Sequence, residues 1–358
     1  MPPIRTNHRR CIPLILTFIL LTGCSGSGLR TDKSTSVQTI LGSPEYRLQI
    51  PSFTKLDAAG KPLGRIARSW SMVRDNHSGL VWEVKTEAEG VHYCRQRYDW
   101  QTAKTGFIDR LNREKFGGAD DWRLPTVREL VSITDKLRFL PAVNTSYFPF
   151  TQAHDYWSAV PDAGDAANAW RVHFCRGYVN SMPKTNEYYV RAVRGASIPE
   201  SDLVDNGDGT FTDRSTGLMW QQKPRWSKSW EEAIIHCDRL KLAGHSDWRL
   251  PHAHELQSLI DYHQSNPAAD SALLKLKPLG KQSEAALEKE RRGYLTDHRL
   301  NFWSATVYAS SPKSAWVVDF KTGLFRHSSK TGEYLVRAVR PVVQTKATAM
   351  NSALDAAK

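Results

Sequence analysis

Asp121-Trp122-Arg123-Leu124-Pro125, repeated as Asp247-Trp248-Arg249-Leu250-Pro251, is the stretch that decides the organisation of this 358-residue chain. Both copies are followed by Glu-Leu, at Glu129 and at Glu255. Three further blocks recur in the same order. They are Asp75–Trp82 with Asp213–Trp220, Tyr156–Ala159 with Phe302–Ala305, and Val190–Arg194 with Val336–Arg340. Because so many blocks cannot share one order by chance, the sequence predicts a duplicated domain.

The duplication predicts a first domain over residues 45–196 and a second over residues 201–343, joined by a short, ordered linker around Pro199. The offset between the copies grows from 126 residues at the Trp-Arg-Leu-Pro block to 146 residues at the Trp-Ser-Ala block. The second domain therefore holds about 20 extra residues between Asp261 and Asn301. This segment is rich in Lys and Arg and is expected to run over the surface.

Local patterns predict that each domain belongs to the α+β class. Thr126 with Glu129, and Ser229 with Glu232, have the spacing of a helix capping box. Later segments alternate instead and indicate strands with one buried face. The inward residues are Trp170, Val172 and Phe174 in the first copy and Trp316, Val318 and Phe320 in the second. We expect two helices and an antiparallel sheet in each domain.

The N-terminus has the pattern of a targeting segment. Arg5, Arg9 and Arg10 precede an apolar stretch over residues 11–21, which is too short for a typical membrane-spanning helix. The stretch ends in Leu21-Thr22-Gly23-Cys24, which resembles the lipobox of bacterial lipoproteins. The resemblance implies a signal peptide over residues 1–23 and a lipid anchor on Cys24.

The residue after the lipobox cysteine is Ser25, and in Gram-negative lipoproteins this implies the outer membrane, on its periplasmic or its surface face. Residues 24–44 are rich in Ser, Gly and Thr and are expected to form a flexible tether. Residues 344–358 are expected to form a flexible tail. The sequence therefore predicts a cell-envelope protein attached to a membrane by its lipid.

The charge balance indicates polyanionic neighbours. The formal net charge is +12, and removal of the three leader arginines lowers it to +9. Such a balance suits acidic polysaccharide or lipid headgroups, although solubility alone also explains it. Because the protein is expected to be exported, nucleic acid is not an expected partner.

Three cysteines remain after removal of the leader and acylation of Cys24, and they face an oxidising compartment. We predict a disulfide between Cys94 and Cys175, because neither has a cysteine counterpart in the second copy. Cys237 falls on the apolar side of its helix and is predicted to be a buried thiol. The cysteine and histidine spacings do not indicate zinc, so no metal is expected.

Both copies resemble the Lcl C-terminal domain family. The resemblance rests on the Trp-Arg-Leu-Pro and Trp-Ser-Ala blocks, on the opening over Asp205–Thr210 and on the closing Val-Arg-Ala-Val-Arg. The Leu-Pro and Glu-Leu step is similar to that of C-type-lectin-like domains, which implies a C-type-lectin-like fold. The named member of the family is a surface adhesin whose terminal domain is associated with sulfated and other acidic glycans.

Catalytic and metal-binding patterns are weak. The Asp205–Asp213 segment carries Gly207 and Gly209 where a calcium loop needs oxygen ligands, so a hairpin is favoured. The nucleophile, zinc-protease and phosphate-loop motifs do not occur, and nothing in the sequence pairs the scattered histidines. His154 and His173 are two of these. We therefore expect a protein that is not an enzyme and needs no cofactor.

The tryptophans of the repeated blocks could stack on sugars, but their places at helix starts and in strands favour core packing. They are Trp122, Trp157, Trp248 and Trp303. Arg123 and Arg249 are expected to hydrogen-bond nearby backbone while their stems pack.

Candidate glycan-binding residues are basic positions expected to face solvent. In the first copy Arg171 and His173 should point outward, and Arg176 follows in the next turn. In the second copy the outward positions are Val317 and Asp319, so the charge shifts to neighbouring residues. These are Lys321, Arg326, His327 and Lys330. The sequence thus favours a non-catalytic adhesin or receptor for acidic polysaccharide, and the alternative is a structural lipoprotein that docks another envelope protein.

Overall fold

The computed structural model describes residues 36–43, 52–199, 201–265, 268, 273 and 300–342. They belong to one compact unit, Ser36–Lys358. The predicted signal peptide, Cys24, the C-terminal tail and most of the Lys/Arg-rich excursion lie outside the described residues. Within the described ranges, no helix combines the length and the apolar character that crossing a membrane requires.

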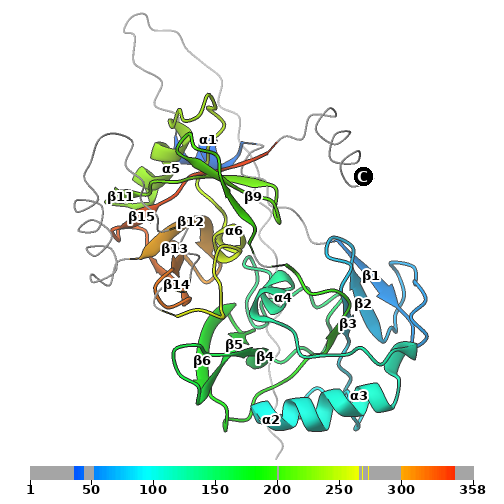
Figure 1. Cartoon of the computed structure of the whole chain (residues 1–358). Helices are drawn as coiled ribbons and strands as arrows, with labels where there is room; N and C mark the ends of the chain where they lie inside the picture. The colour runs from blue at the N-terminus through cyan, green and yellow to red at the C-terminus, as the bar shows by residue number, and fades with distance from the viewer. Residues whose placement is uncertain are drawn as a thin grey trace, which may run out of the picture. The chain divides into compact units, whose positions relative to one another are not determined.

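The chain folds as two tandem α+β copies with mostly antiparallel sheets (Figure 1). Each copy contributes one four-stranded sheet, and the two sheets have equivalent strand orders. The first, in the order β1-β2-β3-β7, comprises β1 (Phe53–Leu56), β2 (Met72–Asp75), β3 (Val81–Glu83) and β7 (Val193–Arg194). The second, in the order β16-β10-β9-β8, comprises β8 (Leu203–Asp205), β9 (Thr210–Asp213), β10 (Leu218–Gln221) and β16 (Val339–Pro341).

A third, eight-stranded sheet contains strands from both copies, in the order β11-β15-β12-β13-β14-β6-β5-β4. The first copy contributes β4 (Asp155–Pro161), β5 (Asn168–His173) and β6 (Tyr178–Pro183). The second contributes β11 (Arg225–Ser227), β12 (Asn301–Tyr308), β13 (Ser311–Asp319), β14 (Phe325–Ser329) and β15 (Tyr334–Val336).

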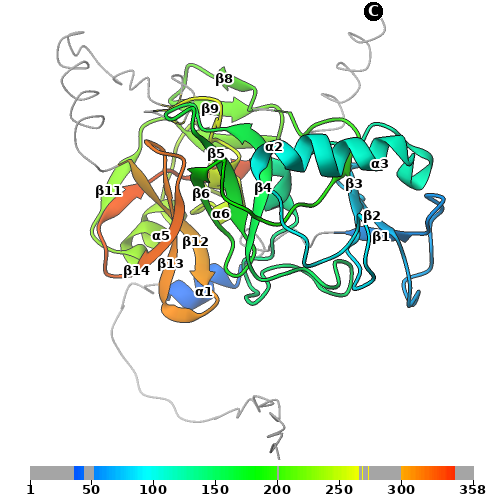
Figure 2. The same ribbon diagram turned by 90° about the horizontal axis from the view of Figure 1, so that it is seen from below.

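Helices are few. In the first copy α2 (Trp100–Thr102), a π-helical stretch over Ala103–Ile108 and α3 (Asp109–Arg113) form one run, drawn in cyan in Figure 2, and α4 (Val127–Ser132) follows. The second copy has α5 (Trp230–Asp238) and α6 (Ala253–Gln257).

Local hydrogen bonds explain where these helices begin. The Thr126 hydroxyl accepts from the Glu129 amide, and the Glu129 carboxylate accepts from the Thr126 amide, which confirms the predicted capping box. Ser229 caps α5 in the same way, although the Glu232 carboxylate accepts from the amide of Lys228 instead.

The glutamates of the repeated motif also pair with its arginines. Arg249 donates two hydrogen bonds of 2.7 and 2.6 Å to Glu255, and Arg123 binds Glu129 in the same fork. The expected bond to nearby backbone exists for Arg123, which donates to the Leu124 carbonyl at 3.4 Å, but the pairing with the glutamates was missed. A planar guanidinium matches a carboxylate better than it matches single carbonyls.

The predicted inward residues are in the core. Trp170, Val172 and Phe174 are buried, as are the tryptophans of the repeated blocks. One apolar cluster around Trp157 lies within the first copy and a second around Trp303 lies within the second copy, whereas the largest contains residues of both. The core favoured for these tryptophans is confirmed, so their faces are not open to sugars.

Equivalent residues of the two copies meet one another. Val179 of β6 pairs with Phe325 of β14, its counterpart 146 residues later. Tyr262 packs on Trp170, while Lys136 lies over Trp316, 5.0 Å from the ring centroid. Tyr262 and Lys136 are equivalent positions, as are the two tryptophans. The copies therefore meet as in a two-fold symmetric dimer.

Part of the predicted tether is ordered. Ser36 caps α1 (Val37–Leu41), which packs against α5 (Figure 1). Ile40 is 4% exposed in the core cluster of the second copy. Because Val37, Ile40 and Leu41 share one helical face, they bury apolar surface, and a flexible tether over residues 36–43 was the wrong expectation.

Candidate functional site

A hollow of about 370 Å³ lies where β5 and β6 of the first copy meet their connecting turn. Its walls include three of the candidate glycan-binding residues. The lining residues are Arg171, His173, Cys175, Arg176, Tyr178 and Asn180. The strand register β5–β6 places Arg171 opposite Asn180 and His173 opposite Tyr178, so these side chains gather at one end of the ladder.

Arg171 is not the solvent-facing cation that alternation predicted. It is only 7% exposed, it forms an ion pair with Asp155, and its guanidinium lies 5.2 Å from the ring centroid of Tyr188. The face of β5 that carries Arg171 is covered like the opposite face, because Ala169, two residues earlier on the same face, is completely buried. Val317, at the equivalent place in the second copy, is also buried, so both outward assignments were wrong.

Asp155 also contacts two histidines, His154 and His173, that no sequence pattern paired. His154 Nδ1 lies 3.4 Å from Asp155 Oδ2, and His173 Nε2 lies 3.9 Å from Asp155 Oδ1. Burial, followed by the charge of Arg171, lowers the pKa of His173 to about 4, and burial also lowers the pKa of His154. Both rings are therefore neutral at pH 7, and the positive charge of the hollow comes from its arginines.

Several buried polar atoms around the hollow have no hydrogen-bond partner among the described residues. They are Arg171 Nε, His173 Nδ1 and Asn180 Oδ1, all on residues that line the hollow. An unsatisfied buried polar group typically costs about 1–3 kcal/mol. A ligand that offers both donors and acceptors would remove this cost.

Tyr178, which lines the hollow, belongs to an aromatic stack that contains residues of both copies. Tyr178 stacks on His327 at 5.9 Å between ring centroids, and His327 stacks on Tyr308 at 3.9 Å. Arg176 hydrogen-bonds Tyr178, which together with the nearby tyrosines raises the pKa of the guanidinium. His327, a candidate from the second copy, therefore contacts the hollow through Tyr178, whereas Arg171, His173 and Arg176 line it directly.

The other candidates of the second copy lie elsewhere. Arg326 is exposed and donates to Asn301 Oδ1 at 3.1 Å. Lys330 lies over the Trp230 ring, and the Lys321 carbonyl accepts from the Ala268 amide. None of the three lines the hollow.

The second copy supplies a natural comparison for this cluster. At the positions of His154, Asp155 and Arg171 it has Leu300, Asn301 and Val317. Leu300 and Val317 are both buried. The equivalent strands of the second copy thus form without this ion pair. Because a buried ion pair is rarely more stable than apolar residues of similar volume, stability alone does not explain its presence in the first copy.

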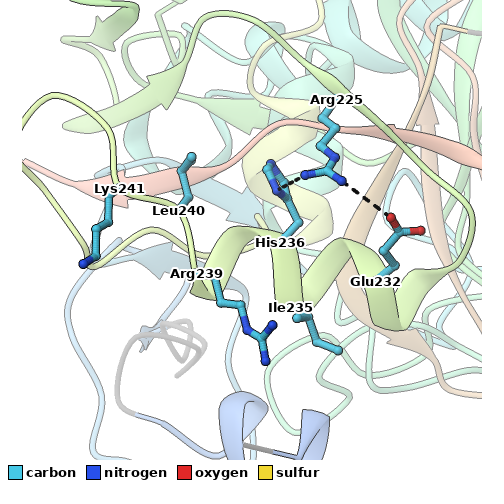
Figure 3. A pocket seen from close by; sticks show the side chains of 7 residues that line it. All are labelled: Arg225, Glu232, Ile235, His236, Arg239, Leu240 and Lys241. Carbon is cyan, nitrogen blue, oxygen red and sulfur yellow. Dashed lines mark hydrogen bonds and ion pairs between the residues drawn. The ribbon is translucent and has the colours of Figure 1, made fainter. Parts of the chain in front are cut away.

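A second hollow of about 370 Å³ lies beside α5 (Figure 3). It is lined by Arg225, Glu232, Ile235, His236, Arg239, Leu240 and Lys241. Arg225 hydrogen-bonds His236 at 3.2 Å and lies 3.8 Å from Glu232, as Figure 3 shows. Among its lining residues only His236 has a buried side-chain atom without a hydrogen-bond partner, whereas Arg171, His173 and Asn180 each have at least one in the first hollow. The second hollow is therefore the weaker candidate for a ligand site.

Cys94, Cys175 and Cys237 are all free thiols, so the predicted Cys94–Cys175 disulfide is absent. Cys94 is buried, and its backbone amide donates to the Thr86 carbonyl. Cys175 instead lines the hollow. Cys237 is the predicted buried thiol, and burial raises its pKa. The absence of cysteine counterparts in the second copy did not identify a bonded pair, because it gives no information about the distance between the two cysteines.

Within the described part of the chain, no three His, Cys, Asp or Glu side chains come together as metal ligands would. The chain has two tandem α+β domains, and the hollow that holds three of the candidate residues is lined by the first. Residues 71–194 and 209–340 match the family model of the Lcl C-terminal domain. The matches cover more than half of the chain, which therefore belongs to the Lcl C-terminal domain family. No curated protein matches the chain.

Proposed function

We propose that this protein is a non-catalytic binding module, an adhesin or receptor for acidic polysaccharide, and that its ligand occupies the hollow of the first domain. The observation that carries the proposal is the cluster of Arg171, Arg176 and unpartnered polar atoms, present in one copy only. Sulfate and carboxylate groups accept charge-assisted hydrogen bonds from arginine. The exposed guanidinium of Arg176 would meet the ligand first, and the partly exposed edge of the Tyr178 stack would lie beside its sugar rings.

The test measures binding of heparin and alginate to residues 36–358, the compact unit, in low and high salt. We expect binding at low salt that weakens as salt rises, because contacts with exposed charges are screened. Arg176→Glu should weaken binding about fivefold or more, since it replaces attraction by repulsion. Arg171 is a poor probe for charge reversal because Asp155 is its buried partner.

The matched control is Arg113→Glu, which changes the net charge equally at an exposed position on α3. It should leave affinity within about twofold of the wild type. Equal losses in both variants would mean that only net charge matters. Absence of binding at low salt would contradict the proposal and favour the alternative of a lipoprotein that docks another envelope protein.

We also propose that each domain has a C-type-lectin-like fold with two helices and an antiparallel sheet. The similarity of the Leu-Pro and Glu-Leu steps supports this, as does the arrangement of α4 and α6 beside the eight-stranded sheet (Figure 1). In this proposal the long loops between strands leave room for a ligand site without altering the sheet.

The protein is further proposed to be a lipoprotein anchored through Cys24 in the cell envelope, at the outer membrane. The lipobox-like Leu21–Cys24 stretch supports this. Cells fed an alkyne palmitate analogue should label the wild type and Cys11→Ala, but not Cys24→Ala, because only the Cys24 thiol would be acylated. A labelled Cys24→Ala protein would contradict the anchor.

A further inference from the structure

An exposed apolar loop lies directly beside the hollow. Large apolar side chains are mostly buried in the described chain, but Leu137, Phe139 and Leu140 are 61%, 50% and 62% exposed. Three such residues within four positions place apolar surface at one point of the first domain. Apolar patches of this kind on a soluble surface mark contact sites.

Hydrogen bonds hold this loop against the turn that carries Arg176. The Leu140 amide donates to the Cys175 carbonyl at 2.8 Å, and the Ala142 amide donates to the Phe174 carbonyl. Lys136 Nζ donates to the Gly177 carbonyl at 2.7 Å. The apolar side chains are therefore fixed next to the basic rim of the hollow.

The second copy shows that this loop can form without apolar residues. Its counterparts of Leu137, Arg138 and Phe139 are His263, Gln264 and Ser265, all exposed. Asp261 accepts from the His263 amide and from Gln264 Nε2, just as Asp135 accepts from the Leu137 amide and Arg138 Nε. The loop conformation thus depends on the aspartate and not on the apolar side chains.

Leu140 adds a local cost to the first copy. Its φ is +57°, a left-handed conformation that leucine disfavours, and the second copy has Asn266 at this position in the sequence. Asparagine tolerates such a conformation better than leucine does. A leucine that is exposed and has an unfavourable backbone conformation contributes little to folding. Its presence is better explained by contact with an apolar surface outside the chain.

We propose that the Leu137–Leu140 loop inserts into the surface of an anionic lipid bilayer, with Arg138 and Arg176 contacting the headgroups. Arg138 is half-exposed beside the apolar tip, and Arg176 is exposed on the adjoining turn. Apolar side chains flanked by cations fit the boundary between acyl chains and negatively charged headgroups. The inference rests on the proposed function, because Arg176 serves both.

The test uses residues 36–358, which exclude Cys24, and vesicles of phosphatidylcholine with or without one quarter phosphatidylglycerol. We expect co-sedimentation with the anionic vesicles and weak binding to the neutral ones. Leu137→Ser, Phe139→Ser and Leu140→Ser together should weaken vesicle binding about tenfold or more, because the buried apolar area is lost. Ile66→Ser, a control at a 94% exposed residue, should leave it unchanged.

Soluble alginate separates this inference from the proposed function. The triple serine variant should keep its alginate binding, while Arg176→Glu should lose affinity for both partners. A wild type that binds alginate but not anionic vesicles would overturn the loop inference and leave the proposed function standing. Self-association that the triple variant abolishes, without vesicle binding, would overturn it in favour of a second copy of this chain. Vesicle binding unchanged in the triple variant would also overturn it.

Discussion

Glu255→Ala is expected to lower the free energy of unfolding by about 3–5 kcal/mol, because it removes the carboxylate that pairs with the buried guanidinium of Arg249. Arg249 and Glu255 are 6% and 8% exposed, and the Glu255 carboxylate also accepts from the His252 amide at the start of α6. The substitution thus removes a fork of two hydrogen bonds and a helix cap together. Urea unfolding of residues 36–358 measures the loss.

The matched control is Glu114→Ala. Glu114 pairs with Arg110 at a similar 2.7 Å, but both side chains are about half exposed. Removal of this pair should cost at most about 0.5 kcal/mol. Arg249→Met combined with Glu255→Leu should recover much of the loss, since neither charge is then buried. A cost below about 1 kcal/mol for Glu255→Ala would contradict the assignment.

The same pair gives an acid limit to stability. Burial alone would raise the pKa of Glu255, but its hydrogen bonds with Arg249 and the Arg249 charge outweigh this and lower the pKa to about 2. The folded-state pKa is thus below the ordinary value of 4.5. Its contribution is complete above pH 4.5 and is lost as the pH falls towards 2, because the unfolded chain then binds the proton more readily.

Features set by neighbours in sequence were predictable. The repeated Trp-Arg-Leu-Pro motif predicted the helix start at Thr126 and the burial of Trp122, because caps and apolar periodicity act within a few residues. The pairing of Arg123 with Glu129 was missed although Glu129 was already recognised as part of a capping box. One carboxylate both caps the helix and binds the guanidinium, and the capping pattern alone does not reveal the second role.

Features set by packing between distant segments were not predictable in this way. Alternation along β5 separates two faces but does not say that both are covered, so Arg171 was wrongly placed in solvent. His154 and His173 meet at Asp155 because β4 pairs with β5 in one register, and no local pattern gives that register. The strand pairing revealed that the first copy has a cluster of charged and histidine side chains where the second has Leu300, Asn301 and Val317.

Lys136→Met is expected to stabilise the protein by about 2–4 kcal/mol at pH 6 and to have little effect near pH 10.5. Burial lowers the pKa of Lys136 from 10.5 to about 7. At 1.36 kcal/mol per pH unit, holding the charge in the folded state costs on the order of 5 kcal/mol. Loss of the bond to the Gly177 carbonyl and of the contact with the Trp316 ring offsets part of the gain.

The direction in which the stability of the wild type changes with pH follows from proton linkage. Between pH 7 and 10.5 the unfolded chain holds a proton on Lys136 that the folded chain has released, so the stability of the wild type rises with pH through this window. Below pH 7 both states are protonated and the full penalty applies. Above 10.5 neither is charged and the penalty vanishes. The difference between wild type and Lys136→Met should therefore be constant below pH 7 and shrink between pH 7 and 10.5.

Urea unfolding at several pH values compares the wild type with Lys136→Met and with Lys61→Met, a control at an exposed lysine. Lys61→Met should shift stability by at most about 0.5 kcal/mol throughout. Lys136→Arg should be destabilised over the whole range, because a guanidinium cannot release its proton. A Lys136→Met difference that does not change with pH would mean that the side chain is neutral throughout or solvated in the folded state. The expected trend would instead show that Lys136 carries its charge without an acidic partner, at low pH, where the two copies meet. The equivalent residue, Tyr262, packs at this contact without a charge.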